Sequence, residues 1–230
     1  MMRLMRALGT ALALCGLVFS GAKAADTLDQ EELLASARFS FERLATSDEL
    51  PTARILMQKA RAVMIFPNLL KGAFFLGGEG GSGVLLVRNA DNSWSYPAFY
   101  TLGSISFGLQ IGGQSSQAVL LVMNDGALDA LLKDQVKLGG DLSAAIGPEG
   151  SGVEASATTS FGEDIYSYST NSGLFVGASL EGAVIARRED WNGAFYNGVV
   201  APREIVIEGR AANGKANPLR DSLANHASGR

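Results

Sequence analysis

Apolar positions near the start of the chain recur at spacings of three and four, which is the period of one helix face. These positions are Leu34, Ala37, Phe41 and Leu44. Thr27 and Gln30 stand three residues apart, as in a capping box that opens a helix, and the pattern ends near Ala45. Pro51 suits the first turn of a second, shorter helix that runs to about Lys59. The pattern therefore predicts two N-terminal helices.

Beyond residue 60 the pattern changes to apolar runs and alternation, which predict strands. Ser104–Ile111 alternates most regularly, and Val119–Val122 is apolar throughout, as is typical of a central strand. Ala62–Phe66 is an apolar run that the following proline is expected to end. Trp94–Tyr100 contains a proline and is therefore expected to be an edge strand. Further strands are predicted at Val153–Phe161, Ile165–Tyr168, Leu174–Ile185 and Glu204–Ile207.

A glycine-rich segment, Gly77–Gly83, lies between two apolar runs. Within it, Gly78, Gly80 and Gly83 satisfy the pattern G-x-G-x-x-G. A dinucleotide site needs this pattern to open a helix, because helix N–H groups bind the phosphate. Here the apolar run Val84–Val87 follows, so the segment is predicted to be a tight turn between two strands. This favours an antiparallel β protein over a nucleotide-binding enzyme.

Two other segments complete the predicted organisation. Asn124 is expected to cap a short internal helix, and the polar segment Gly209–Arg230 is predicted to be disordered or at most partly helical. Gly173 and Gly177 share one strand face, which favours a sharply bent sheet. The predicted fold class is α+β, in one domain of residues 25–208: a curved, mainly antiparallel, glycine-rich β-sheet or partly closed barrel, with two N-terminal helices and a short internal helix.

The first 24 residues have the pattern of a signal peptide. Arg3 and Arg6 precede an apolar stretch, Ala7–Phe19, that is too short to span a bilayer, and Ala22–Ala24 form an A-x-A cleavage site. Lipoprotein anchoring at Cys15 is not expected, because a bulky leucine precedes it where a small residue is required. The mature chain is predicted to start at residue 25 and to be periplasmic or secreted.

Cleavage of this leader changes the charge and removes the only cysteine. The whole chain has 19 basic and 23 acidic residues, for a net charge of −4. Without the three basic residues of the leader, 16 basic residues face 23 acidic ones, and the net charge becomes −7. A protein this acidic is a poor non-specific binder of nucleic acid, so no nucleic-acid partner is expected. Without a disulfide, its stability must come from the core.

Residues that carry catalysis or bind metals are scarce. The single histidine, His226, lies in the predicted tail, so no Ser-His-Asp or Cys-His arrangement is predicted. The acidic residues are scattered without metal-ligand spacing, so neither a metal nor a cofactor is expected. The chain is therefore not predicted to be an enzyme. A hydrolase with a carboxylate pair stays as an alternative, because sequence does not show which distant acids meet.

One stretch is basic and apolar at once. Basic groups beside apolar anchors suit an anionic membrane surface, where each basic group contributes about 1 kcal/mol. The candidates for head-group contact are Arg54, Lys59, Arg61 and Lys71. The candidates for apolar anchoring are Phe66, Leu69 and Leu70. The alternative interpretation is that the basic residues form a solvated helix face and that the apolar ones belong to the core.

Several separated segments resemble, in the same order, the motifs of the SYLF-domain family. The first is Ala60–Pro67, which is followed by the glycine-rich segment and Gly83–Val87. The others are Trp94–Ala98, Gly108–Gln114, Tyr168–Ser169, Gly173–Gly177 and Asn192–Tyr196. The similarity covers about Leu33–Glu208, nearly the whole predicted mature chain.

SYLF domains are known as lipid-binding modules; eukaryotic members bind phosphoinositides, and some bind actin filaments. The resemblance implies a non-catalytic module of the bacterial envelope that binds anionic membrane lipids or phosphoinositide-like head groups. The predicted export makes actin an unexpected partner, and the chain lacks the basic N-terminal extension of eukaryotic members. Asn197 replaces the glycine that usually follows the aromatic pair, and asparagine tolerates the positive φ of such a turn. The alternative function is an envelope scaffold that binds proteins without specific lipid binding.

Overall fold

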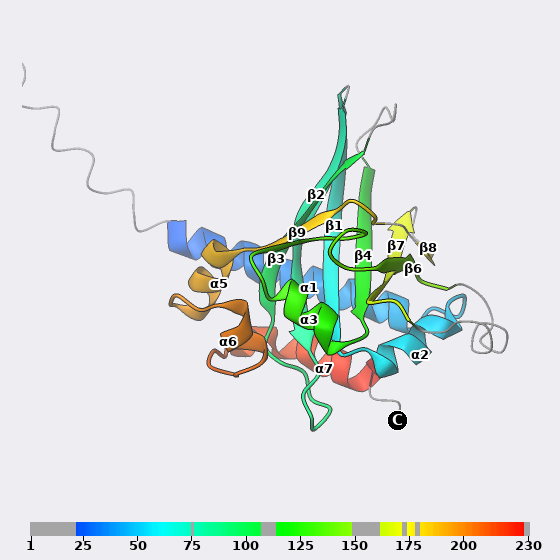
Figure 1. Cartoon of the computed structure of the whole chain (residues 1–230). Coiled ribbons are helices and arrows are strands. Elements are labelled where there is room, and N and C mark those ends of the chain that lie inside the picture. Colours follow the sequence, from blue (N-terminus) through cyan, green and yellow to red (C-terminus); the bar gives the residue numbers. More distant parts are fainter. Residues whose placement is uncertain are drawn as a thin grey trace, which may run out of the picture.

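The computed structural model describes residues 22–74, 76–106, 114–148, 162–171, 174–177 and 180–227. In these residues one curved sheet lies between two groups of helices (Figure 1). The strands are β1 Ala62–Phe74, β2 Leu76–Val87, β3 Ala98–Ser106, β4 Gln114–Val122, β5 Gln135–Lys137, β6 Ala144–Ile146, β7 Ile165–Asn171, β8 Leu174–Gly177 and β9 Val184–Arg187. The helices are α1 Ala22–Ala45, α2 Pro51–Lys59, α3 Asp125–Leu131, α5 Glu189–Tyr196, α6 Pro202–Val206, the 3-10 helix η1 Gly214–Ala216 and α7 Asn217–Ala227.

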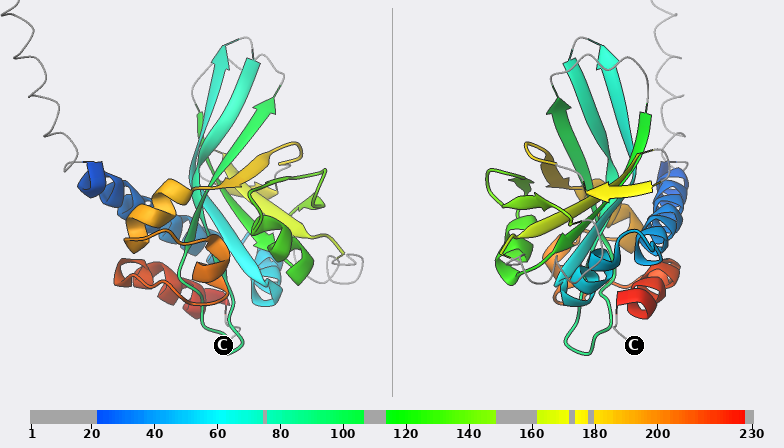
Figure 2. Two further views of the ribbon diagram at one scale, coloured as in Figure 1. Left: turned by 60° about the vertical axis from the view of Figure 1, so that its left-hand side comes forward. Right: turned by 90° about the vertical axis from the view of Figure 1, so that its right-hand side faces the viewer.

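The described strands form one sheet in the order β5-β9-β3-β2-β1-β4-β7-β6, and β8 also pairs with β7. Neighbouring strands are antiparallel except for β6 and β7, which are parallel. The sheet curls, and the far ends of β1 to β4 extend beyond the helices (Figure 2). These features confirm the predicted α+β class and the curved, mainly antiparallel sheet.

Each face of the sheet carries its own core. Val63 and Ile65 of β1 pack toward α1, α2, α5 and α7, whereas Met64 and Phe66 pack toward α3 and α6. Because both faces are covered, β1 and β4 are apolar at successive positions rather than at alternate ones. The prediction of a central strand at Val119–Val122 is confirmed, since β4 lies between β1 and β7.

The prediction that Gly77–Gly83 forms a turn is wrong. These residues belong to β2, which pairs with β1 as far as Phe74 opposite Leu76. Strand β1 shifts register between Ile65 and Leu70, and this irregularity brings it close to β2. A Cβ atom at Gly81 would overlap the Asn68 carbonyl, and one at Gly83 would overlap the Phe66 ring. The glycines therefore allow a close approach between strands rather than a reversal of the chain.

Prolines also act differently from the prediction. Strand β1 does not end at Pro67 but runs on to Phe74, because Pro67 lies inside the register shift, where ladder hydrogen bonds are interrupted. Pro97 does not mark an edge strand. It precedes β3, which pairs with β2 on one side and with β9 on the other. In both cases the missing N–H falls where the sheet does not need it.

The predicted helices α1, α2 and α3 are confirmed. The Asn124 side chain accepts a hydrogen bond from the Ala127 N–H at the start of α3, as the sequence predicted. Asn197 ends α5 with φ of 57°, which confirms that asparagine adopts a positive φ at this turn. The predicted strand Ile165–Tyr168 lies in β7, and Leu174–Ile185 contributes to both β8 and β9. The predicted strand Ser104–Ile111 is described as far as Ser106, where it forms the end of β3. Its residues 107–111 and the whole predicted strand Val153–Phe161 lie outside the described residues.

The prediction of a strand at Glu204–Ile207 is wrong: Pro202 and Glu204 occupy the first turn of α6, where the Glu204 carboxylate accepts from the Ala201 N–H. Of the predicted tail, the structure describes residues 209–227, and there the partly helical alternative holds, because α7 forms and buries one face against α1. The buried residues of α7 are Leu219, Ser222, Leu223 and Ala227. The domain therefore continues past residue 208 to the end of α7.

Residues 1–21 of the predicted leader lie outside the described residues, and residues 22–24 are the first three residues of α1. Among the helices of the described residues, none has the length and apolarity needed to cross a bilayer.

Candidate functional site

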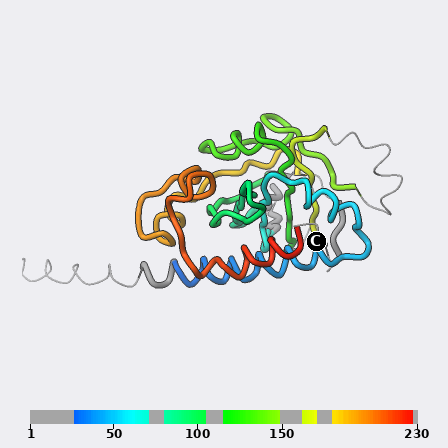
Figure 3. Tube along the Cα trace, turned by 90° about the horizontal axis from the view of Figure 1, so that it is seen from below, coloured from blue at the N-terminus to red at the C-terminus, as the bar shows by residue number. Residues whose placement is uncertain are grey.

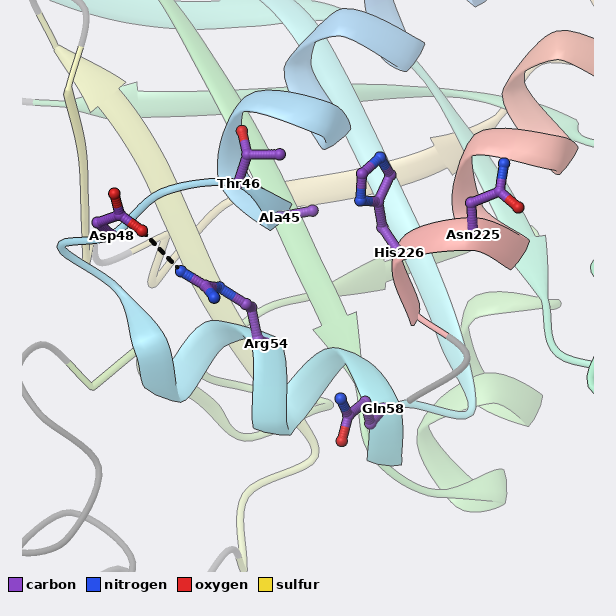
Figure 4. A pocket seen from close by; sticks show the side chains of 7 residues that line it. All are labelled: Ala45, Thr46, Asp48, Arg54, Gln58, Asn225 and His226. Atoms are coloured by element: carbon purple, nitrogen blue, oxygen red, sulfur yellow. Dashed lines mark hydrogen bonds and ion pairs between the residues drawn. The ribbon is translucent and has the colours of Figure 1, made fainter. Parts of the chain in front are cut away.

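A cavity of about 430 Å³ opens where the C-terminal ends of α1, α2 and α7 come together (Figure 4). Its lining is polar and comes from all three helices and from the turn that joins α1 to α2. The lining residues are Ala45, Thr46, Asp48, Arg54, Gln58, Asn225 and His226. This opening, called the α2 cavity below, contains one of the predicted head-group residues.

Arg54 reaches the cavity because α2 is amphipathic. Thr52, Ala53, Leu56 and Met57 form its buried face, and Arg54 lies on the exposed one. Its guanidinium donates hydrogen bonds to the Ser47 carbonyl at 2.9 Å and to Asp48 Oδ1 at 3.2 Å. Both members of this ion pair are exposed, so the pair is weak and a competing anion can replace the carboxylate.

His226 lies on the opposite side of the α2 cavity, in the last turn of α7 (Figure 4). Its imidazole packs edge-on against Phe41 of α1, with ring centroids 6.5 Å apart. The sequence pattern did not place this residue in a site, because residues 209–230 were predicted to be disordered or at most partly helical. The spacing of Leu219, Leu223 and Ala227, four residues apart, was the signal of an amphipathic helix that could have found it.

The groups that line the α2 cavity suit an anion better than a chemical reaction. Arg54 carries a fixed positive charge, and the His226 imidazole and the amides of Gln58 and Asn225 offer N–H donors. A nucleophile activated by a base, or two carboxylates facing one another, would be needed for hydrolysis. The α2 cavity contains one carboxylate, that of Asp48. A phosphate or carboxylate group is therefore the kind of ligand that this arrangement can bind.

The position of α2 against α7 depends on Arg88, at the end of β2. Its guanidinium donates to the carbonyls of Met57 at 2.7 Å, Ala60 at 3.0 Å and Ala227 at 3.1 Å. These carbonyls lie at the C-terminal ends of α2 and α7, where helices leave acceptors unsatisfied. The guanidinium also lies 4.6 Å from the centroid of Trp94. Burial, and then the neighbouring charge of Arg61, lower the pKa of Arg88. Arg88 thus joins the two helices that form the cavity walls.

Two further predicted basic residues lie near this corner. Lys59 is the exposed last residue of α2. Arg61 immediately precedes β1, pairs with Asp125 at 2.6 Å and donates to the Arg88 carbonyl. Arg54, Lys59 and Arg61 therefore come from one corner of the fold, where Arg54 pairs with Asp48 and Arg61 with Asp125.

The predicted apolar anchors are corrected by their burial. Phe66 and Leu69 are 0% exposed and belong to the core on the α3 and α6 side of the sheet, because β1 is covered on both faces at these positions. Leu70 is 66% exposed, but it lies nine residues beyond Arg61 along β1, roughly 30 Å away. The Lys71 side chain lies outside the described residues. Among the candidates whose side chains are described, Leu70 therefore lies far from the corner that holds Arg54, Lys59 and Arg61.

Comparison with known proteins connects this fold to a named family. Residues 103–226 match the sequence profile of Ysc84, described as "Las17-binding protein actin regulator". The chain is 32% identical over 181 residues to an SH3 domain-containing protein of Schizosaccharomyces pombe, covering 77% of this chain and 41% of that protein.

Two further relatives give the same result. The human SH3 domain-containing YSC84-like protein 1 is 31% identical over 177 residues, which cover 76% of this chain and 51% of the relative. Protein YSC84 of Saccharomyces cerevisiae is 30% identical over 171 residues, which cover 73% and 36%. The chain thus spans about half or less of the length of these relatives.

Proposed function

The chain belongs to the Ysc84 (SYLF) family of non-enzymatic binding domains, and from that premise we propose that it is a lipid-binding protein of the bacterial envelope. Its ligands are anionic membrane lipids or phosphoinositide-like head groups. The predicted leader, with cleavage after residue 24, directs it to the periplasm or the exterior.

The observation that supports this proposal most is the position of Arg54 in the α2 cavity. A phosphate group that enters the cavity replaces the exposed Asp48 carboxylate as the partner of the Arg54 guanidinium. The amides of Gln58 and Asn225 supply further donors on either side. Lys59, five residues further along at the end of α2, adds a positive charge to the same corner.

Vesicle co-sedimentation tests this proposal. We expect the purified protein to bind vesicles that contain an anionic lipid, to bind purely zwitterionic vesicles less, and to lose affinity at higher salt. Arg54→Gln and Lys59→Gln are each expected to weaken binding about fivefold, because one basic group at an anionic surface contributes about 1 kcal/mol. Lys133→Gln is the matched control, since Lys133 is also exposed but follows α3 on the other face of the sheet.

The outcomes separate the site from the function. If the protein binds anionic vesicles and neither α2 variant weakens binding more than Lys133→Gln does, the α2 cavity is the wrong site. If the unmodified protein binds no vesicle, lipid binding itself is refuted. The location is tested separately: the exported form should lack the first 24 residues by intact mass and appear in the periplasmic or extracellular fraction.

A second candidate function is supported by the names of the relatives. Several are SH3 domain-containing proteins, and the family profile is described as Las17-binding. An envelope scaffold that binds proteins would give a defined partner in pull-downs and no preference among lipids. Actin is not an expected partner for an exported protein. The salt-dependent vesicle assay above distinguishes the two candidates.

A further inference from the structure

Helix α1 has apolar side chains on its outward face as well as on its buried face. Leu28 is 66% exposed and Phe39 is 56% exposed, although α1 also supplies much of the core. Five exposed residues recur at spacings of three and four along this outward face, called the outer stripe below. They are Leu28, Glu32, Ala35, Phe39 and Arg43. Helix α1 runs along the margin of the molecule, beside α7 (Figure 3).

The outer stripe is complementary to itself. Glu32 lies toward its N-terminal end and Arg43 toward its C-terminal end, with Ala35 and Phe39 between them. When a second α1 helix lies antiparallel across the first, Glu32 of each copy faces Arg43 of the other, and Ala35 faces Phe39. This arrangement has the twofold symmetry of an isologous contact, in which one surface patch meets its own copy.

A hollow beside the outer stripe suits the Phe39 side chain of the second copy. A cavity of about 350 Å³ lies between α1 and the segment formed by η1 and α7. Its walls are apolar at Leu34, Ala35, Pro218 and Leu219, and Arg38 together with the Glu31–Lys215 ion pair forms its polar rim. Ala35 belongs to both the hollow and the outer stripe. A small residue at this point leaves room for an aromatic ring.

The Phe39 side chain stays largely exposed in the single chain. The Arg38 guanidinium lies over its ring, 4.8 Å from the centroid, and Phe39 is still 56% exposed. A large exposed aromatic side chain next to an apolar hollow is typical of an interface anchor. A membrane surface is the less suitable occupant, because Asp29 and Glu32 are exposed on the same side of α1 and would be repelled by anionic lipid.

We propose that the outer stripe of α1 binds a second copy of this chain. The two α1 helices pack antiparallel, Phe39 of each copy enters the hollow beside Ala35 of the other, and Glu32 pairs with Arg43 across the twofold axis. None of the five residues of the outer stripe lines the α2 cavity, so this proposal does not depend on the proposed lipid binding.

Sedimentation velocity over a range of protein concentrations tests the contact. The unmodified protein is expected to form a dimer, and Phe39→Ser is expected to weaken dimerisation about tenfold or more, because it removes the central anchor. Leu70→Ser is the matched control. Leu70 is also a large exposed apolar residue, at 66% against 56% for Phe39, but it lies on the sheet, so its replacement leaves dimerisation unchanged. Thermal unfolding of each variant checks that these exposed substitutions leave the fold intact.

Charge exchange tests the antiparallel register. Glu32→Arg and Arg43→Glu are each expected to weaken the dimer, because each places like charges opposite one another. The double variant with both substitutions restores dimerisation, since the pairs are again of opposite sign. A protein that stays monomeric at every concentration overturns the proposal, as does a double variant no better than the single ones. Loss of vesicle binding by Phe39→Ser in a monomeric protein would assign the outer stripe to the membrane instead.

Discussion

Replacing Arg88 with methionine separates the packing of this side chain from its hydrogen bonds. Methionine keeps an unbranched stem against Trp94, but the carbonyls of Met57, Ala60 and Ala227 lose their donor. A hydrogen bond from a charged donor contributes about 1.5–3 kcal/mol, and part of this is recovered when water reaches the partly exposed carbonyls. We therefore expect the free energy of unfolding to fall by about 3–5 kcal/mol.

Urea unfolding followed by circular dichroism measures this loss as a lower midpoint at an unchanged slope. Arg88→Lys should recover part of the stability, because one ammonium group cannot reach three carbonyls in the geometry of the guanidinium. Arg210→Met is the control: Arg210 pairs with Glu204 and Glu208 on the surface, and its loss should cost less than about 1 kcal/mol. If Arg88→Met cost no more than this control, Arg88 would not be the link between α2 and α7.

Three further substitutions test other parts of the fold. Gly83→Ala should lower the free energy of unfolding by about 3 kcal/mol, measured in urea, because its Cβ overlaps an aromatic ring and a carbonyl of β1; a neutral effect would refute the close approach of the two strands. Asn192→Ala removes a buried amide that accepts from the Phe99 N–H at 2.8 Å and donates to the Phe99 carbonyl at 3.3 Å. The free energy of unfolding is expected to fall by about 2–3 kcal/mol, seen as a lower Tm. An unchanged Tm would mean that water replaces the amide. Hydrogen bonds, first of all from the Asn124 amide, hold the pKa of Asp164 below its ordinary value. The stability that ionised Asp164 contributes is therefore complete above a pH of about 4 and is lost as the pH falls through the lower folded-state pKa. Asp164→Asn should flatten the dependence of the free energy of unfolding on pH in this range. An unchanged pH dependence would exclude Asp164 as the cause of the acid destabilisation.

Local sequence signals predicted the elements whose causes are local. Pro51 at the start of α2 and Asn124 at the start of α3 act through neighbouring residues, so the sequence alone was enough to place both helices. The left-handed conformation of Asn197 was expected from the family resemblance, because asparagine tolerates a positive φ. A cap or a turn is determined by a few consecutive residues, and no distant contact is needed to recognise it.

The errors occurred where distant contacts decide the structure. A glycine that permits a turn and a glycine that permits close packing against a neighbouring strand look the same in sequence. Gly83 is of the second kind, which becomes clear only from its contact with β1 at the register shift. Helix α7 is short and mostly polar, so its stability comes from burying Leu219 and Leu223 against α1 rather than from its own composition.

The candidate site was predicted only in part for a related reason. Neighbours in sequence separate along an extended strand, so Leu70 moves far from Arg61 although nine residues part them. A continuous apolar run also does not reveal which residue is exposed, and Phe66 proved to be core because β1 is covered on both faces. The contribution of His226 to the α2 cavity required the tertiary contact between α7 and α1.

The packing of α7 against α1 has a consequence for shortened forms of this protein. Helix α7 covers apolar residues of α1, and its last residue, Ala227, accepts a hydrogen bond from Arg88. A product cut before Asn217 loses this cover, so apolar side chains of α1 become accessible to solvent. Such a fragment is expected to be cleared by proteases faster than the intact chain.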